Sequence, residues 1–403
     1  MLIQNLKVSG LLSFGPNGVD LDMRKLNVLI GPNGSGKSNL LEVINLFREA
    51  PSPRRSIAGP IMDNGGIDEW MWKGDWNLDD APPPASVSWV VSKPNGSGVL
   101  HEMQFYASNH MLRMANERIE SIQSVDQSNS PWWFYRMNVS KKPFVAHFHD
   151  STGPDGFDVI RTIPHDELNS SASILAQIRD PGRYKVFEYL EKLYSGIQMY
   201  RDWCFGPQSG IRSPSRGDGR IDVLSRAGEN LALMVADMPS AVEARVILEL
   251  QTLYEDVQGI KARPVAGGNL QLFLTELGER EIPASRLSDG TLRYLALLII
   301  LLDAKPPPLI VIEEPELGLH PDVIPQIAKL LKEASERTQL VVTTHSRMLV
   351  DALGDDPESV IVCEKHNGES VFERLNAERM AVWLEKYSLG DLWSKGELGG
   401  NRW

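Results

Sequence analysis

The chain has 403 residues, 42% of them hydrophobic and 23% charged, which fits two to three folded domains and excludes global disorder. Its 41 basic and 53 acidic residues give a formal charge of −12, which argues against a wholly basic nucleic-acid coat and leaves a local basic face open. The longest apolar run, Tyr294–Leu302, is far shorter than the ~20 residues that cross a bilayer. Only two cysteines are present, so we expect neither a disulfide framework nor a thiolate zinc site. We find no secretory signal and expect a cytoplasmic protein with no membrane segment.

The first half of the chain predicts short strands around one helix. Leu2–Asp22 predicts two strands joined by a turn at Gly15–Gly18, and Leu26–Ile30 predicts a buried strand ending at Gly31. A helix follows, with Leu40, Ile44 and Phe47 on one face. Residues 51–84 predict loops, and residues 108–165 carry no pattern that we can assign. A β-hairpin is predicted for Ser86–Val91 and Val99–Tyr106.

The second half alternates between helical patterns and buried strands. An exposed loop is expected over 206–220, and Trp383 is expected to pack on the core because Val382 and Leu384 flank it in a helical stretch. The predicted helices lie within Asp166–Leu193, Asn230–Asp237, Ala241–Tyr254, Thr291–Asp303 and Val323–Glu336, and the predicted strands are Leu270–Thr275, Leu309–Ile312 and Leu340–Thr343.

A phosphate-binding loop is the most specific signal in the sequence. Gly31–Ser38 matches G-x-x-x-x-G-K-[ST], with an apolar strand before it and an amphipathic helix after it. The glycines allow backbone N–H groups to turn toward a phosphate, and the start of the helix adds its positive dipole end. Lys37 is then expected to reach the β- and γ-phosphates, and the Ser38 hydroxyl to hold Mg²⁺. A chance glycine-rich turn is the alternative.

Three weaker signals follow in the second half. Two carboxylates, Glu313 and Glu314, end a buried strand and suit metal binding and the orientation of a water molecule, although acidic pairs also cap strands at surfaces. Ser288 and Gly290 begin an apolar helix, where they form either an anion cradle or an ordinary helix cap. His345 follows another buried strand, and a lone histidine there is usually structural.

The order of these motifs resembles the ABC-class ATPase heads of the SMC/RecF-like kind. The matching stretches are GPNGSGKSNLLE, LSDGT as the signature motif, VIEEPELGLHP as Walker B with the D-loop, and TTHS as the switch-histidine motif. More narrowly, the chain is similar to the stand-alone bacterial predicted AAA-type ATPases near the OLD-family ATPase domain, several of which occur in anti-phage operons. The motifs cluster in residues 1–50 and 270–350, and the tail over 371–403 also resembles this narrower group.

The resemblance implies an α/β fold, namely a P-loop NTPase head of the ABC type. A mixed sheet flanked by helices is expected, with an N-terminal antiparallel β subdomain and a compact helical insertion. The expected parts are an N-terminal lobe over 1–165, a mainly helical insertion or lid over 166–265, a C-terminal lobe over 266–370 and a tail over 371–403.

The resemblance also assigns roles to individual residues. Glu314 becomes the catalytic carboxylate, His345 the γ-phosphate sensor, and Ser38 with Glu313 the Mg²⁺ ligands. Ser288 and Gly290 become the signature that contacts ATP held by the other subunit, which implies a head-to-tail homodimer with two ATP molecules. The residues expected to bind ATP are Asn33, Gly34, Ser35, Gly36, Lys37, Ser38 and Asn39.

The sequence departs from the pattern in four places. Glu313 stands where Walker B usually carries Asp, so the carboxylate reaches one methylene further. The signature reads LSDGT instead of LSGGQ, and Gly10–Phe14 lacks the arginine that is frequent there in RecF-like heads. No Q-loop is evident, and Gln104 is a weak candidate for its glutamine.

We expect an ATP-gated dimeric switch that controls a separate effector, a nuclease among the candidates, in anti-phage defence. The alternative is a RecF-like DNA-binding clamp. Its best support is Arg201–Arg226, with five arginines against three aspartates, although we favour a solvated flexible loop as the explanation of this stretch. The 58 residues from Ser346 to Trp403 leave no room for a fused nuclease, so the chain alone is expected to cut neither DNA nor RNA. The long insertion between residues 108 and 265 counts against a transporter subunit.

Overall fold

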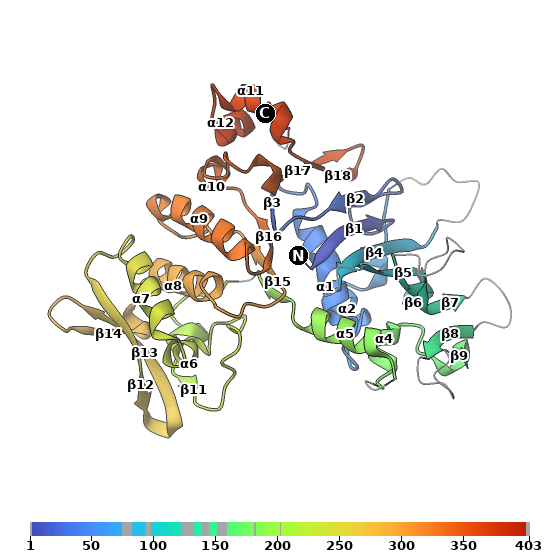
Figure 1. The fold of residues 1–403 in the computed structure, drawn as a ribbon, viewed down its shortest axis with the longest axis horizontal. Helices are drawn as coiled ribbons and strands as arrows, with labels where there is room; N and C mark the ends of the chain where they lie inside the picture. Colours follow the sequence, from blue (N-terminus) through green and yellow to red (C-terminus); the bar gives the residue numbers. More distant parts are fainter. Residues whose placement is uncertain are drawn as a thin grey trace.

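The computed structural model describes residues 2–74, 83–93, 98–122, 132–138, 145–150, 159–180, 183–201 and 203–399. The connection within the predicted hairpin at 94–97, parts of the predicted loops over 51–84 and of the unassigned stretch 108–165, residue 202 and the last four residues of the tail lie outside these ranges. Three sheets organise the chain: a central sheet, a large antiparallel sheet on one side and a small sheet on the other (Figure 1).

The central sheet confirms the buried strands that the sequence predicts and adds three more. Its order is β10-β15-β16-β3-β17-β18, and every neighbouring pair is parallel except β17 with β18. The first five strands therefore present their carboxyl ends at one edge. The strands are β3 (Leu26–Ile30), β10 (Gln198–Tyr200), β15 (Leu309–Glu313), β16 (Gln339–Thr343), β17 (Val360–His366) and β18 (Glu369–Arg374).

Alternate residues of the central strands enter two separate apolar cores. Leu29 of β3 packs with α1 (Lys37–Glu49), whereas its neighbours Val28 and Ile30 pack with α8 (Asp289–Leu301) and α9 (Ile324–Ser335). Because both faces of the sheet are covered, its strands are continuous apolar runs. Helix α8 is buried on nearly all sides, which agrees with the apolar helix expected from the sequence.

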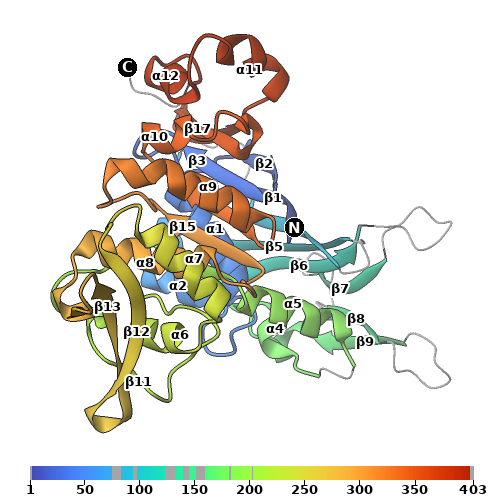
Figure 2. The same ribbon diagram turned by 60° about the vertical axis from the view of Figure 1, so that its left-hand side comes forward.

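The N-terminal antiparallel sheet has the order β2-β1-β4-β5-β6-β7-β8-β9 (Figure 1). Figure 2 shows its strands β5 to β9 on the side of the molecule away from the small sheet. The predicted hairpin is confirmed as β4 and β5. The unassigned stretch 108–165 extends the same sheet by four strands, each antiparallel to the one before. The strands are β1 (Ile3–Ser9), β2 (Val19–Asp22), β4 (Ala85–Ser92), β5 (Gly98–Ser108), β6 (Met111–Ser121), β7 (Trp133–Asn138), β8 (Val145–Asp150) and β9 (Val159–Pro164). Two short helices, α2 (Ala58–Asp63) and α3 (Ile67–Trp70), interrupt the expected loops over 51–84.

The stretch over 166–265, expected to be mainly helical, is mixed. After the helices α4 and α5 the chain contributes β10 to the central sheet, and it then builds a lobe of helices and the small sheet β11-β13-β12 with β14 beside β13 (Figure 1). The elements are α4 (Ile174–Gln177), α5 (Lys185–Ser195), α6 (Leu231–Ala236), α7 (Ser240–Leu250), β11 (Ser215–Arg216), β12 (Val257–Val265), β13 (Asn269–Glu276) and β14 (Glu281–Pro283).

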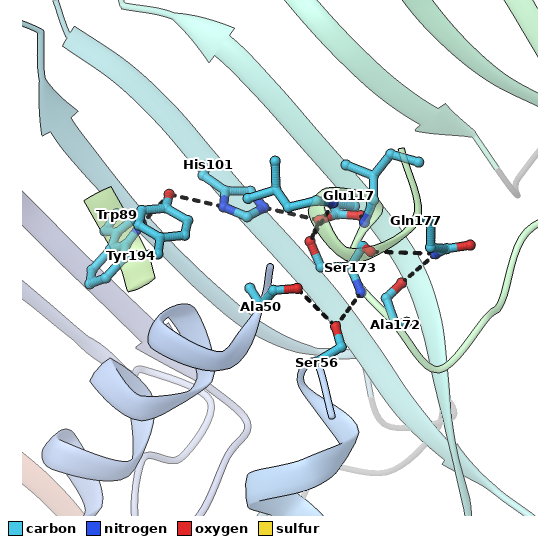
Figure 3. A network of polar contacts seen from close by, with 11 residues as sticks. Ala50, Ser56, Trp89, His101, Glu117, Ala172, Ser173, Gln177 and Tyr194 are labelled. Carbon is cyan, nitrogen blue, oxygen red and sulfur yellow. Dashed lines mark hydrogen bonds and ion pairs between the residues drawn. The ribbon is translucent and has the colours of Figure 1, made fainter. Parts of the chain in front are cut away.

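A buried polar network joins the end of α1 to the antiparallel sheet (Figure 3). The Ser56 hydroxyl donates to the Ala50 carbonyl and accepts from the Ser173 amide, and the Ser173 hydroxyl donates to Glu117. Glu117 Oε1 lies 3.0 Å from His101 Nε2. The chain of contacts continues from His101 Nδ1 to the Tyr194 hydroxyl, which accepts from the indole of Trp89. Partnered in this way, the buried polar groups do not leave unpaired charge in the core.

The C-terminal tail forms two short helices, α11 (Ala377–Leu384) and α12 (Leu389–Ser394), at the top of Figure 1. Trp393 is buried, in line with a packing role. Trp383 is 46% exposed and its neighbour Val382 69% exposed, so the expectation that Trp383 packs on the core is wrong. Helix α11 has no fully buried residue and packs on the core through the half-buried Leu384. The side that carries Val382 and Trp383 is therefore left facing outward. None of the helices in the described ranges combines the length and apolar content needed to cross a bilayer.

Candidate functional site: the carboxyl edge of the central sheet

The phosphate-binding loop lies between β3 and α1, as the motif predicts. Gly31 has φ +146°, and a Cβ there would collide with the carbonyl oxygen of Cys363 on β17. Gly36 has φ +101° and would collide with the Ser370 hydroxyl. Only glycine fits both constraints, so these two residues shape the loop for a backbone cradle. Ser35 is buried, and its hydroxyl has no hydrogen-bond partner among the described residues.

Lys37 is folded back on its own loop. Its ammonium group donates to the carbonyls of Gly31, at 2.7 Å, and Pro32, at 3.0 Å. Burial lowers the pKa of Lys37, and the nearby Glu313 and Glu314 oppose that shift. A phosphate placed in the loop would exchange these carbonyl partners for anionic oxygens, which form stronger hydrogen bonds with a cation.

Ser38 and Glu313 meet across the edge of the sheet. The Ser38 hydroxyl donates to Glu313 Oε1 at 2.8 Å, so the first turn of α1 and the end of β15 are in direct contact. Octahedral Mg²⁺ with bonds of about 2.0–2.1 Å separates neighbouring ligands by about 2.9 Å. A hydroxyl and a carboxylate at this spacing fit the ion, with the remaining positions left to water and phosphate.

The neighbouring carboxylate, Glu314, has a left-handed backbone with φ +46°. Its amide donates to the Thr343 carbonyl at 3.0 Å, and its carbonyl accepts from the Arg293 guanidinium at 2.9 Å. The same guanidinium lies over the rings of Trp203 and Phe205. Arg293 on α8 therefore anchors the main chain of Glu314, whereas the Glu314 carboxylate stays one-third exposed.

His345 faces Glu314 across the same edge, with 3.8 Å between Nε2 and Oε1. Burial lowers the pKa of His345, the charge of Lys37 lowers it further, and Glu314 opposes both. The imidazole is therefore neutral at pH 7, and in that form it offers one donor and one acceptor.

Glu316 holds the loop that carries His345, a role that the sequence did not suggest. Its Oε1 accepts hydrogen bonds from the Thr344 hydroxyl and from the amides of His345 and Ser346. Burial raises the pKa of Glu316, and these hydrogen bonds limit the rise. A third acid so soon after Glu313 and Glu314 was the signal available in the sequence.

Arg201 is a second residue that the sequence did not assign to the site. Arg201 Nε donates to Glu313 Oε2 at 2.9 Å, and one terminal nitrogen donates to Glu42 of α1 at 2.5 Å. Burial lowers the pKa of Arg201, but the hydrogen bonds to Glu42 and Glu313 outweigh it and raise the pKa above its ordinary value. Although Gly10–Phe14 lacks an arginine, a cation from the residue after β10 therefore lies beside Glu313.

The other predicted ATP ligands occupy the loop and the first turn of α1. Asn33 and Gly34 are exposed at the tip of the loop. Asn39 donates to the Ser13 hydroxyl at 2.7 Å, so it faces the connection between β1 and β2. Gln104 lies elsewhere: it donates to Glu102 on the same strand, β5, and lines a cavity of about 740 Å³ on the antiparallel sheet. The structure therefore does not support Gln104 as a Q-loop residue.

The signature forms the start of α8. The Ser288 hydroxyl accepts from the Thr291 amide at 3.0 Å, which caps the helix. A Cβ on Gly290 would lie 3.2 Å from the Gly318 carbonyl, so the signature approaches the loop after β15. Buried Arg212 donates to the carbonyls of Ala284 and Leu287 and pairs with Asp289. Among the contacts of the described residues, none joins Ser288 or Gly290 to the phosphate loop of the same chain.

Comparisons with known proteins give one matching family model and several similar folds. The chain matches the family model described as AAA domain, putative AbiEii toxin, Type IV TA system, over residues 26–94 and 230–351, which contain every motif above. No curated protein matches the sequence. Among solved structures, the chain is similar to an SMC head bound to the C-winged helix domain of ScpA, with 17% identity, 94% of this chain and 99% of that chain covered, and a TM-score of 0.54.

A second similar structure is the Smc head domain with an extended coiled coil, derived from Pyrococcus furiosus and bound to the C-terminal domain of ScpA. It has 17% identity and a TM-score of 0.54, and the match covers 95% of this chain and 98% of that chain. At this level of identity the likeness establishes the fold and leaves activity to be argued from the site.

Proposed function

We propose that this chain, which matches an AAA-domain family model and has the fold of SMC heads, is an ABC/SMC-like ATPase that binds ATP with Mg²⁺, hydrolyses it and acts as a dimeric switch on a separate protein. One observation carries the proposal. Lys37, Ser38, Glu313, Glu314 and His345 come from three neighbouring strands or their following loops and converge on one edge of the sheet. A surface turn or a structural histidine would not require this convergence.

Each residue has a step suited to its chemistry. Backbone amides of the loop and Lys37 would hold the phosphates, and Ser38 with Glu313 would hold Mg²⁺, which when bound neutralises phosphate charge. Glu314 is suited to accept a hydrogen bond, and then a proton, from the attacking water. Neutral His345 is placed to donate a hydrogen bond toward the γ-phosphate, and its distance of 3.8 Å from Glu314 leaves both side chains room to turn.

Dimerisation follows from the position of the signature. Ser288 and Gly290 lie at the start of a long helix, whose positive dipole end can bind an anion. In the described residues they make no contact with the phosphate loop of their own chain. We propose that they bind ATP held by a second copy, so that two ATP molecules close a head-to-tail homodimer.

A protein partner is favoured over DNA by the state of the basic stretch Arg201–Arg226. Arg201 and Arg212 point into the fold, and Arg216 and Arg220 are paired with Asp218 and Asp222. Few of these cations remain to neutralise phosphates of a nucleic acid. Anti-phage defence is the setting that we propose. It rests on the resemblance to the stand-alone bacterial ATPases and on a family description that names a toxin.

The test is to incubate the purified full chain with ATP and Mg²⁺ and to measure its mass by light scattering and phosphate release in parallel. We expect a dimer that forms with ATP and disperses as ATP is hydrolysed. Lys37→Ala is the matched control and should lose ATP binding in calorimetry with an unchanged circular dichroism spectrum, because within the described part of the chain its ammonium donates its hydrogen bonds to loop carbonyls. Wild-type ATP affinity in Lys37→Ala would refute the phosphate site.

A further inference from the structure

The parallel pairing of β10 with β15 brings Arg201 beside Glu313. Tyr200 is in register with Ile312, so the next residue of each strand, Arg201 and Glu313, leaves the sheet at the same edge. The guanidinium then forks between Glu313, through Nε at 2.9 Å, and Glu42, through a terminal nitrogen at 2.5 Å. All three side chains are less than one-quarter exposed.

The two oxygens of Glu313 have different partners. Oε1 accepts from the Ser38 hydroxyl, and Oε2 accepts from Arg201. Ser38 and Glu42 lie four residues apart on α1, so one face of that helix supplies both the hydroxyl and the acid that holds Arg201. Four side chains from three parts of the fold thus form a chain of contacts, whose two ends, Ser38 and Glu42, lie one turn apart on α1.

The length of Glu313 gives its carboxylate a conformational freedom that these contacts restrict. A glutamate has one more rotatable bond than an aspartate, and each additional rotamer removes the carboxylate from its productive position for part of the time. Because Glu42 holds one donor of the planar guanidinium, the Nε donor keeps a fixed direction toward Glu313. The single ammonium of a lysine has no such rigid pair of donors.

We propose that Arg201 is the positioning residue for Glu313, holding Oε2 so that Oε1 stays directed at Ser38, where Mg²⁺ would bind with ATP. This inference rests on the proposed function, because it concerns the metal ligand of the same site. It explains how a glutamate serves at a position that usually carries the shorter aspartate.

Removing Arg201 has two opposing effects on Mg²⁺. Loss of a positive charge should raise the affinity for Mg²⁺. Loss of the hydrogen bond from Arg201 should lower that affinity, because the Glu313 carboxylate can then take other rotamers. A paired variant separates them: Arg201→Gln with Glu42→Gln removes one positive and one negative charge and keeps the net charge of the site. Residual weakening in this pair then reports positioning alone.

The test is calorimetric binding of ATP to the full chain, first with EDTA and then across a Mg²⁺ titration. For Arg201→Gln and for the paired variant, we expect unchanged ATP affinity in EDTA and a roughly 10- to 100-fold higher Mg²⁺ requirement, the usual effect of losing a residue that orients a metal ligand. Arg201→Lys, which keeps the charge and loses the fork, should be weakened as well. The control is Arg216→Gln, whose ion pair with Asp218 is exposed, and it should match the wild type.

The outcomes separate the two proposals. A paired variant with the wild-type Mg²⁺ requirement, or full rescue by Arg201→Lys, would show that only charge matters and would overturn the inference. Tighter Mg²⁺ binding in Arg201→Gln would overturn it too, because Arg201 would then be a competitor of the metal. If the wild-type chain binds no ATP in either buffer, the proposed function itself fails. Thermal melting of each variant shows whether it is folded before its binding is compared.

Discussion

At the level of single residues, the backbone of Glu314 stands out. A left-handed φ costs a non-glycine residue about 1–3 kcal/mol, and such strain persists only where surrounding contacts impose it. Thr343 and Arg293 supply those contacts through the amide and the carbonyl of Glu314. The left-handed backbone turns the chain at Glu314, so that the Glu313 carboxylate faces Ser38 and the Glu314 carboxylate faces His345.

Glu314→Gln should separate binding from hydrolysis. The amide keeps the size of the side chain but cannot accept a proton from water, so the hydrolysis rate should fall by roughly 10²–10⁴-fold, the worth of a positioned general base. ATP binding should survive because Lys37 and Ser38 are untouched. Single-turnover phosphate release and calorimetry measure the two quantities.

Glu313→Gln is the comparison for that experiment. It should first weaken the Mg²⁺-dependent part of ATP binding, because it replaces one metal-facing oxygen. Wild-type hydrolysis in Glu314→Gln combined with an inactive Glu313→Gln would reverse the two assigned roles.

At the level of elements, the network in Figure 3 fastens α1 to β5, β6 and α4. Replacing Glu117 with Ala removes the acceptor of the Ser173 hydroxyl and of the Ile174 amide and leaves His101 Nε2 without its carboxylate. Leaving buried donors without their acceptor in this way costs about 1–3 kcal/mol for each group.

Urea denaturation of Glu117→Ala should show that loss in the free energy of unfolding. Glu373→Ala on β18 is the matched control, because its side chain is 77% exposed and its change should stay within about 0.5 kcal/mol. Equal stability of the two variants would mean that the network does not hold the elements together.

The predictability of the elements followed their length and burial. Apolar runs at Leu26–Ile30 and Leu340–Thr343 were visible because both faces of the central sheet are covered. Strand β10 has three residues, too few for any periodicity, and only its pairing with β15 defines it. The strands β7–β9 have six residues each, which is a weak pattern to recognise without knowing their neighbours.

The candidate site divides in the same way. The phosphate loop is local in sequence, so its spacing sufficed to predict it. Arg201 is 112 residues from Glu313 and 159 from Glu42, and Arg293 meets Glu314 only because α8 packs beside β15. Contacts of this range depend on topology, which a motif does not encode.

At the level of the whole molecule, a substitution in the signature tests whether two copies form a dimer around ATP. Ser288→Arg places a long cation at the capped start of α8. If Ser288 contacts ATP of a second copy, the variant should lose ATP-dependent dimerisation and at least 90% of hydrolysis together, a loss of about 1.4 kcal/mol or more in transition-state stabilisation. Light scattering and phosphate release report both. A monomeric variant with full activity would contradict an active site completed by a partner.

The strand order has a further consequence for how the protein is made. The phosphate loop follows β3, yet the two strands beside β3 are β16 and β17, which lie near the other end of the chain. Ribosomes add about 5–20 residues per second, so a growing chain carries the complete loop for many seconds before its lateral supports leave the ribosome. Chains arrested before Gln339 should therefore retain no ATP on a filter, in contrast to the finished protein. We therefore expect the chain to become able to bind ATP only late in its synthesis. An interrupted product should bind no ATP although it contains every residue of the loop.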